Sequence, residues 1–230
     1  MIKKNLCSQR TKMAAISAVL LALFSLVALS SACCTPDQWE GVESSIGGWA
    51  GRRRSGLLKE FVFASYDYTN KRSAAFLDYA NGEYFNRFQI VVRYEGEVGN
   101  LYIVDLKRNK CWLKTLKRPF RQACIPEKAK SVGDYYLGLK GGFKVSGYAI
   151  EGERINAFIS VQNVSGSCIP VSEAVYGKLT KVEFVQTVGF VNLTPGIKNE
   201  TVFDVPAQCE KKEDFSLAEE LTRDHYFFAI

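Results

Sequence analysis

The residue types that usually carry catalysis are scarce in this chain. Its one histidine, His225, would have to supply the base of any Ser-His or Cys-His arrangement, and it lies close to the C-terminal end. The glycine-rich segment 138–142 lacks the Gly-Lys-Ser/Thr ending of a phosphate-binding loop, and no EF-hand motif occurs. The 24 Asp and Glu residues are scattered, so that no pair stands out as a general acid and base. We therefore predict a protein without catalytic residues, not an enzyme.

Positive charge is concentrated in one internal stretch. Seven Lys and Arg residues occur within residues 107–121, without an acid and with Trp112 and Phe120 interleaved. This pattern fits a solvated strand-and-turn surface, and it also fits a contact for anionic headgroups or sulfated glycans. In the second case, the candidate headgroup residues are Lys107, Arg108, Lys110 and Lys114.

The N-terminal residues predict secretion. A basic stretch, an apolar run at 14–29 and the small residues Ser30-Ser31-Ala32 match a signal peptide over residues 1–32. The alternative is an uncleaved membrane anchor, whose apolar core usually needs about 20 residues. Cleavage would remove four cations and leave 26 cations against 24 anions, a net charge of +2. Such a near-neutral body argues against a dedicated nucleic-acid binder, which would need a broad basic face.

Cysteine usage agrees with an oxidising compartment. Cys7 belongs to the predicted signal peptide, which leaves an even six: Cys33, Cys34, Cys111, Cys124, Cys168 and Cys209. Structural zinc is disfavoured because the chain has no Cys-x-x-Cys and a single histidine. We predict disulfides, although spacing alone cannot choose among the 15 pairings that six cysteines allow.

Three Asn-x-Ser/Thr triplets predict N-glycosylation in a secreted protein. Their acceptors are Asn163, Asn192 and Asn199. Pro195 directly follows the second triplet, which makes Asn192 the least favourable acceptor.

The elements that must position any site are predicted to be strands. Runs rich in aromatic and β-branched residues are separated by Gly, Asn, Asp or Pro, and they occur at 61–66, 88–94, 101–104, 155–161 and 182–188. Residues 95–100 predict a hairpin connection. A short helix is predicted at 214–221, where Ser216 and Glu219 form a capping box. No composition break divides the mature chain, which predicts one antiparallel all-β domain.

Several of these runs are apolar on both faces. Two packed sheets would explain this, and so would one sheet face that lines a ligand cavity while the other meets the core. The pattern of the chain alone favours the two packed sheets.

The segment Cys33-Cys34-Thr35-Pro36-Asp37-Gln38-Trp39-Glu40-Gly41 resembles the opening motif of ependymin-related proteins. Further matches follow in the order of that family: residues 102–105 with 109–111, then 125–126, 168–171, and 196–198 with 202–206 and Cys209. The resemblance spans roughly residues 33–210. It implies an ependymin-like domain over 33–212 and a C-terminal tail, partly helical or disordered, over 213–230.

This resemblance implies a fold of two curved antiparallel sheets, a half-barrel or sandwich around an apolar pocket, similar to bacterial lipoprotein carriers. It also implies a secreted glycoprotein, often a homodimer, associated with lipid, calcium, extracellular matrix and lysosomal delivery. Carried over by position, Cys33 would pair with Cys168 and Cys111 with Cys209. Cys34 and Cys124 are additional here and are inferred to pair, although the adjacent Cys33 and Cys34 could exchange partners.

The first functional hypothesis is an extracellular or lysosomal carrier of a hydrophobic or anionic lipid, since an acyl chain gains roughly 0.8 kcal/mol per buried CH₂. The pocket lining predicted from the strand runs is Phe61, Phe63, Ile90, Val92, Tyr102, Val104, Phe158 and Phe184. The alternative is a matrix or adhesion protein, including a biomineral matrix, that binds calcium weakly. Its predicted ligands are Glu95, Glu97 and Asp105. No other cofactor and no nucleic-acid partner are predicted.

Overall fold

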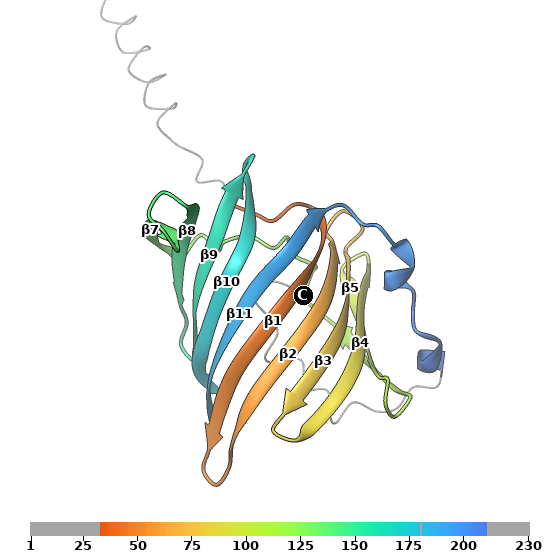
Figure 1. Cartoon of the computed structure of the whole chain (residues 1–230). Helices are drawn as coiled ribbons and strands as arrows, with labels where there is room; N and C mark the ends of the chain where they lie inside the picture. The colour runs from red at the N-terminus through yellow and green to blue at the C-terminus, as the bar shows by residue number, and fades with distance from the viewer. Residues whose placement is uncertain (1–32, 180, 211–230) are drawn as a thin grey trace, which may run out of the picture. The chain divides into compact units, whose positions relative to one another are not determined.

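The computed structural model describes residues 33–179 and 181–210, and within them eleven antiparallel β-strands join into one sheet (Figure 1). The strands are β1 (Gln38–Gly51), β2 (Ser55–Asp67), β3 (Arg72–Asn81), β4 (Tyr84–Glu95), β5 (Val98–Asp105), β6 (Lys110–Leu116), β7 (Lys130–Leu137), β8 (Phe143–Glu151), β9 (Ile155–Val164), β10 (Ser167–Leu179) and β11 (Val182–Pro195). The predicted signal peptide, the predicted helix at 214–221, the tail from 213 and His225 lie outside the described residues.

Local sequence explains the strands and their turns. The five predicted runs lie within β2, β4, β5, β9 and β11, and the predicted hairpin at 95–100 turns over Gly96 and Glu97. Gly96 has a φ of 68°, which glycine adopts without steric strain. Between β9 and β10, Ser165 and Gly166 both have positive φ, as a two-residue type I′ turn requires. The predicted antiparallel all-β class is confirmed.

The strands follow the order β6-β5-β4-β3-β2-β1-β11-β10-β9-β8-β7, and the sheet curls (Figure 1). β1 pairs with β11 along nearly its whole length, from Trp39 opposite Pro195 to Gly51 opposite Val182. This pairing joins the two halves of the chain into one continuous sheet, where the sequence had predicted two. The difference arises because a pairing between segments so far apart in the chain leaves no local signal in the sequence.

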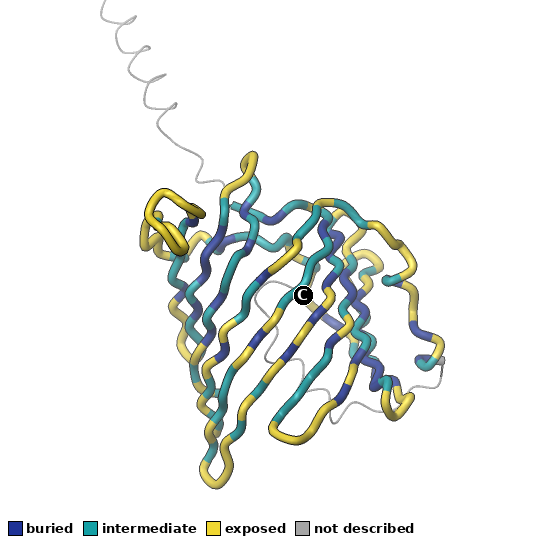
Figure 2. The backbone as a smooth tube through the Cα atoms, viewed as in Figure 1, coloured by how far each residue is buried: buried dark blue, intermediate teal, exposed yellow. Residues whose placement is uncertain are grey.

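The two faces of the sheet differ in what covers them. We call inner the face that carries the two largest apolar clusters, and outer the opposite face. One inner cluster spans β1–β6 around Trp39, Tyr66 and Phe88. The other spans β8–β11 around Ile159 and Phe190. Ala123 and Leu193 pack against both clusters, so the inner face forms one apolar surface. Exposed and buried positions alternate along β1, β2 and β11 (Figure 2), as expected for strands with one covered face.

Two short 3-10 helices cover part of the outer face: η1 (Glu200–Phe203) and η2 (Ala207–Glu210). Phe203 of η1 packs against Ala74 and Val91, and its ring lies 4.2 Å from the Arg72 guanidinium. Arg72 also pairs with the fully buried Asp67 and with Glu200. Within residues 33–179 and 181–210, no helix has the length and hydropathy that a membrane span requires.

Candidate functional site

The segment between β6 and β7, residues 117–129, crosses the inner face from one edge strand of the sheet to the other. We call it the crossing segment. Its Phe120 ring lies 5.6 Å from the ring of Tyr66 and 5.3 Å from that of Tyr94. Ile125 belongs to the second inner cluster. The crossing segment therefore covers part of the inner face with its own apolar side chains.

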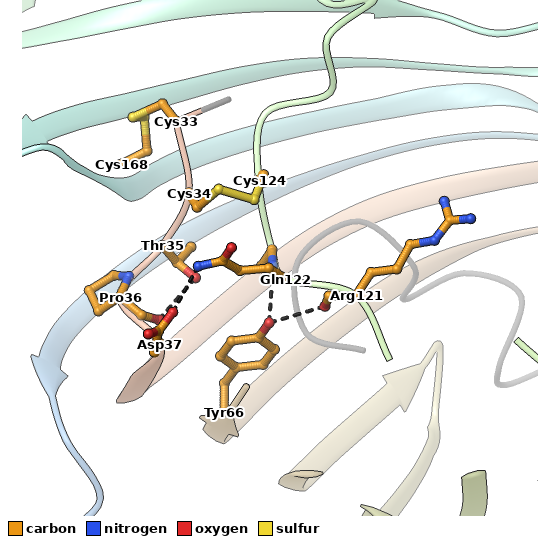
Figure 3. Close-up of a disulfide and its surroundings, with 11 residues drawn as sticks. Cys33, Cys34, Thr35, Pro36, Asp37, Tyr66, Arg121, Gln122, Cys124 and Cys168 are labelled. Atoms are coloured by element: carbon orange, nitrogen blue, oxygen red, sulfur yellow. Dashed lines mark hydrogen bonds between the residues drawn. A yellow bond between two sulfur atoms is a disulfide. The ribbon is translucent and has the colours of Figure 1, made fainter. Parts of the chain in front are cut away.

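Hydrogen bonds hold the crossing segment in place (Figure 3). The Tyr66 hydroxyl donates to the Arg121 carbonyl at 3.1 Å and accepts from the Ala123 amide at 3.0 Å. Burial of this hydroxyl raises the pKa of Tyr66 above its usual value, so it stays protonated and keeps its donor role. The amide of Thr35 donates to the Ala123 carbonyl at 2.8 Å. The crossing segment is thus fixed to both β2 and the N-terminal residues.

The described residues contain three disulfides: Cys33–Cys168, Cys34–Cys124 and Cys111–Cys209. The first and third are the pairs that the family resemblance implied, and the second is the pair inferred for the two additional cysteines. Figure 3 shows the first two side by side, Cys33 linked to β10 and Cys34 linked to the crossing segment. Cys111–Cys209 joins β6 to η2 on the outer face.

A row of side chains crosses the inner face at one level of the sheet. Successive strand pairs place Glu60 opposite Ser45, Ser45 opposite Val188, and Val188 opposite Glu173. Directly paired residues project to the same face, so the row continues to Tyr79 on β3 and, through Ile159, to Tyr148 on β8. We call Glu60, Ser45, Glu173 and the adjacent Gln186 the polar row.

The members of the polar row are buried and connected on the β2 side. The Glu60 carboxylate accepts from the Ser45 hydroxyl at 2.8 Å and from the Gln186 amide at 2.7 Å. The same amide donates to Ser45 at 2.8 Å. These contacts join β2, β1 and β11, so the polar row depends on the central β1–β11 pairing.

Glu173 lies on the β10 side of the polar row and is only 5% exposed. Its Oε1 atom is buried and has no hydrogen-bond partner. Burial, together with the charge of the nearby Glu43, raises the pKa of Glu173 to about 8. Glu173 is therefore mostly protonated at neutral pH, and it is a buried carboxylic acid within an apolar surface.

Apolar side chains that remain partly accessible surround the polar row. Tyr79, Val188 and Tyr148 lie in the same cross-strand row and are half-buried. Phe184 and Ile155, also half-buried, lie further toward the β1–β2 hairpin. This arrangement offers an apolar contact surface with a few polar groups at its centre, which is the usual lining of a small-molecule site.

The predicted pocket lining does not form one surface. Ile90, Val92 and Phe184 lie on the inner face. The other five lie on the outer face according to strand pairing: Phe61, Phe63, Tyr102, Val104 and Phe158. The prediction that these eight residues line one pocket was wrong, because successive side chains of a strand point to opposite faces of the sheet. An unbroken apolar run therefore does not indicate which residues point inward.

The predicted basic residues lie at one edge of the sheet. Lys107 and Arg108 occupy the β5–β6 turn, and their amides donate to Asp105 at 3.0 and 2.8 Å. Lys110 and Lys114 lie on the edge strand β6, on the same face as Trp112. The structure thus groups Lys107, Arg108 and Lys110 at one end of β6, with Lys114 further along it.

The predicted calcium ligands are not brought together. Glu95 and Glu97 lie at the β4–β5 hairpin, while Asp105 lies at the other end of β5, about 23 Å away at 3.3 Å per residue. Asp105 is buried and accepts hydrogen bonds from Asn86 and from the following turn. The described residues contain no group of three or more His, Cys, Asp or Glu side chains that could hold a metal ion. The three acids therefore do not make a shared site.

All three predicted glycosylation acceptors are exposed. Asn163 lies at the β9–β10 hairpin, where its side-chain oxygen accepts from the Gly166 amide. Asn192 has a positive φ of 56° in β11, and Asn199 caps η1. Their positions are open to modification, and their glycosylation stays a prediction.

The outer face carries exposed apolar side chains that the sequence pattern did not distinguish from core residues. Large apolar side chains on β1–β4, β10 and β11 are exposed there: Ile46, Leu57, Phe61, Phe63, Phe76, Phe85, Tyr176, Val185 and Val191. We call them the outer apolar patch. Leu57 is 63% exposed, and Phe63 and Phe76 are directly paired. Exposed apolar side chains gathered on one face in this way are typical of interaction surfaces.

Comparison with known proteins shows that this chain is similar to ependymins. The family model described as Ependymin matches residues 84–209, more than half of the 230-residue chain. Ependymin from Notemigonus crysoleucas is 26% identical over 176 residues, which cover 74% of this chain and 78% of that protein. Ependymin-related protein 1 from Haliotis asinina is 23% identical over 206 residues, which cover 84% and 97%.

A search of solved structures found bacterial proteins with low similarity to this chain. An uncharacterized conserved protein from Thermus thermophilus has a TM-score of 0.44 at 10% identity, with 79% of this chain and 91% of that chain covered. A domain from Vibrio parahaemolyticus named for outer membrane lipoprotein sorting has a TM-score of 0.33 at 6% identity, with 72% and 89% covered. Nothing about function follows from such low scores.

Proposed function

This chain belongs to the ependymin family, and from that premise we propose that it binds a hydrophobic, lipid-like ligand on the inner face of its sheet. Membership of this family and the three disulfides indicate an extracellular protein. The proposal is for a carrier or binding protein, not an enzyme.

One observation carries the proposal: the partly accessible apolar side chains that surround the polar row. Tyr79, Tyr148, Ile155, Phe184 and Val188 lie next to fully buried clusters but are themselves only half-buried. Covering their remaining surface with an acyl chain would contribute roughly 25 cal/mol per Å² of apolar area removed from water. An anionic headgroup would then meet Lys110 and Lys114, which lie on the same face at the edge strand β6.

The calcium-associated matrix function stays a prediction. No contact among the described residues favours it over ligand binding, since its three predicted acids lie apart.

Val188→Trp should reduce ligand binding at least tenfold because the larger ring would occupy the surface beside the polar row. The matched control is Glu183→Trp, which places the same ring on the exposed outer side of the same strand. The measurement is organic extraction and mass spectrometry of the protein from a secreting eukaryotic host, followed by titration with a fluorescent fatty acid. A stoichiometric lipid in the wild type and its loss in Val188→Trp are the expected results. A wild type that copurifies with no lipid and takes up no fatty acid at neutral or acidic pH would overturn the proposal.

We also propose that two copies of the chain pack through the outer apolar patch. Stacked sheets pack about 10 Å apart through apolar side chains. The outer apolar patch offers such side chains on six strands. A homodimer would bury Leu57, Phe63 and Val185, which are each more than half exposed.

Phe63→Glu should weaken the dimer strongly because it would bury an unpaired carboxylate in an apolar interface. Sedimentation equilibrium should show a dimer for the wild type and a monomer for the variant at the same concentration. Leu139→Glu is the matched control, since Leu139 is 87% exposed but lies in the β7–β8 turn. A wild type that sediments as a monomer, or a Phe63→Glu variant that stays dimeric, would contradict this assignment.

A further inference from the structure

Glu173 is a costly residue for the inside of an apolar sheet. Its strand position faces the inner clusters, next to Val188 of β11 and Ile159 of β9. Only 5% of it is exposed, and its Oε1 atom has no hydrogen-bond partner. A buried polar atom without a partner destabilises the folded protein, because it has lost its hydrogen bonds to water and gained none in return. An interior carboxyl group that serves packing alone would be better replaced by an apolar side chain.

The surroundings of Glu173 carry one sign of charge. The titratable side chains of the described residues that share the inner face near it are Glu43 on β1, Glu60 on β2 and Tyr148 on β8. β9 and β11 contribute Ile159 and Val188 at its sides. Glu43 acts on Glu173 as a like charge. The charge of Glu43 therefore disfavours a second negative group at this point and favours a positive one.

The amide and hydroxyl donors of the polar row are turned toward Glu60 and not toward Glu173. Gln186 donates to Glu60 at 2.7 Å and to Ser45 at 2.8 Å. Ser45 in turn donates to Glu60. A ligand group that binds beside Glu173 must therefore bring its own hydrogen-bond donors, as an alkylammonium group does.

We infer that the polar row binds the ammonium group of an amphiphile, with Glu173 as its principal carboxylate contact and the half-buried apolar side chains around its alkyl chain. This inference deepens the proposed function and rests on it. The site is separate from the basic residues on β6, since four strand spacings of about 4.8 Å lie between β2 and β6.

Binding of the ammonium group would displace one proton from Glu173. Without ligand, Glu173 holds a proton below pH 8, because burial and Glu43 disfavour its charged form. When the ammonium binds, Glu173 releases that proton to solvent and becomes the carboxylate partner of the cation. The alkylammonium keeps its own proton, as its pKa is about 10.4 by analogy with lysine. Affinity for the cation should therefore rise with pH up to about 8.

The test compares dodecylamine, dodecanol and dodecanoate, all below their micelle concentrations, by isothermal titration on delipidated full-length protein at pH 6, 7 and 8. Because Glu173 must release a proton when the ammonium binds, the affinity for dodecylamine should increase about 50-fold from pH 6 to pH 8. The affinity for dodecanol, which carries no charge, should stay constant. The same titrations in buffers of different ionisation enthalpy should show the released proton directly.

Glu173→Gln should abolish both the pH dependence and the proton release, and bind dodecylamine no better than dodecanol. Glu183→Gln removes an exposed carboxylate from the outer face of the neighbouring strand and should behave as wild type. If dodecanol and dodecanoate bind but dodecylamine gains nothing at pH 8, the ammonium assignment is overturned while the proposed function stands. If none of the three compounds binds, the proposed function itself fails.

Discussion

Glu173→Gln is expected to raise the unfolding free energy over that of the wild type by about 4 kcal/mol more at pH 8.5 than at pH 5. The pKa of Glu173 rises from 4.5, the usual value, to about 8 in the folded protein. Between these two values the folded chain binds a proton that the unfolded chain does not. Wild-type stability therefore falls as pH rises through this window, by up to about 1.4 kcal/mol per pH unit. Glutamine stays neutral throughout and does not incur this loss.

Urea unfolding at pH 5, 6, 7, 8 and 8.5, with the disulfides intact, measures this difference. The wild-type and Glu173→Gln curves should nearly coincide at pH 5 and separate as pH rises. Glu183→Gln again serves as the control, because the Glu183 carboxylate is mostly exposed and pairs with Lys178. If the unfolding free energies of wild type and Glu173→Gln change with pH in parallel, the pKa of Glu173 is not raised in the folded protein.

The double variant Cys34→Ser/Cys124→Ser should lose about 3–4 kcal/mol of unfolding free energy. This disulfide joins residues 90 positions apart, and a cross-link over a loop of that length typically contributes about 2–4 kcal/mol or slightly more. It also anchors the crossing segment to the N-terminal residues, beside the Thr35–Ala123 hydrogen bond. Both cysteines are replaced together because a single free thiol could exchange with the adjacent Cys33–Cys168 bond.

The local consequence should be a less protected crossing segment. Lys117 and Arg121 lie in this segment and offer tryptic sites, so limited trypsin digestion should cut the double variant within residues 117–129 faster than wild type. Tyr66→Phe is the informative comparison, because it removes only the hydroxyl that bonds Arg121 and Ala123 and should cost about 1–2 kcal/mol. Unchanged stability and unchanged cleavage in the double variant would mean that the hydrogen bonds and the packing of Phe120 and Ile125 hold the segment without the disulfide.

The sequence predicts some features of this structure much better than others. Strand runs such as 88–94 and 155–161 combine aromatic and β-branched residues, and all of the predicted runs are strands in the structure. β1 was not predicted because its residues 44–51 are small or glycine-rich, and its extended form depends on pairing with both β2 and β11. Two cysteine pairs, Cys33–Cys168 and Cys111–Cys209, followed from the positions of these cysteines in the family motifs, and Cys34–Cys124 was inferred for the two cysteines that remained.

The polar row was not predicted, and no signal in the sequence indicates it. Ser45 and Gln186 are 141 positions apart, and Glu60 and Gln186 are 126 apart. Each is an ordinary polar residue in a strand with alternating faces. Their shared burial appears only when β1 pairs with β11 in one register, because a shift by one residue would send each side chain to the opposite face.

The sequence by itself determined that this protein is built from antiparallel strands, that it has the motifs of the ependymin family, and which cysteines those motifs imply as pairs. These properties are local, or they depend on the order of motifs along the chain. Only the tertiary structure decided that the strands form one sheet, which face Phe63 and Val92 occupy, and that Glu43, Glu60 and Glu173 lie on one inner surface. These depend on strand register and on the curl of the sheet, since residues distant in sequence become neighbours only through pairing.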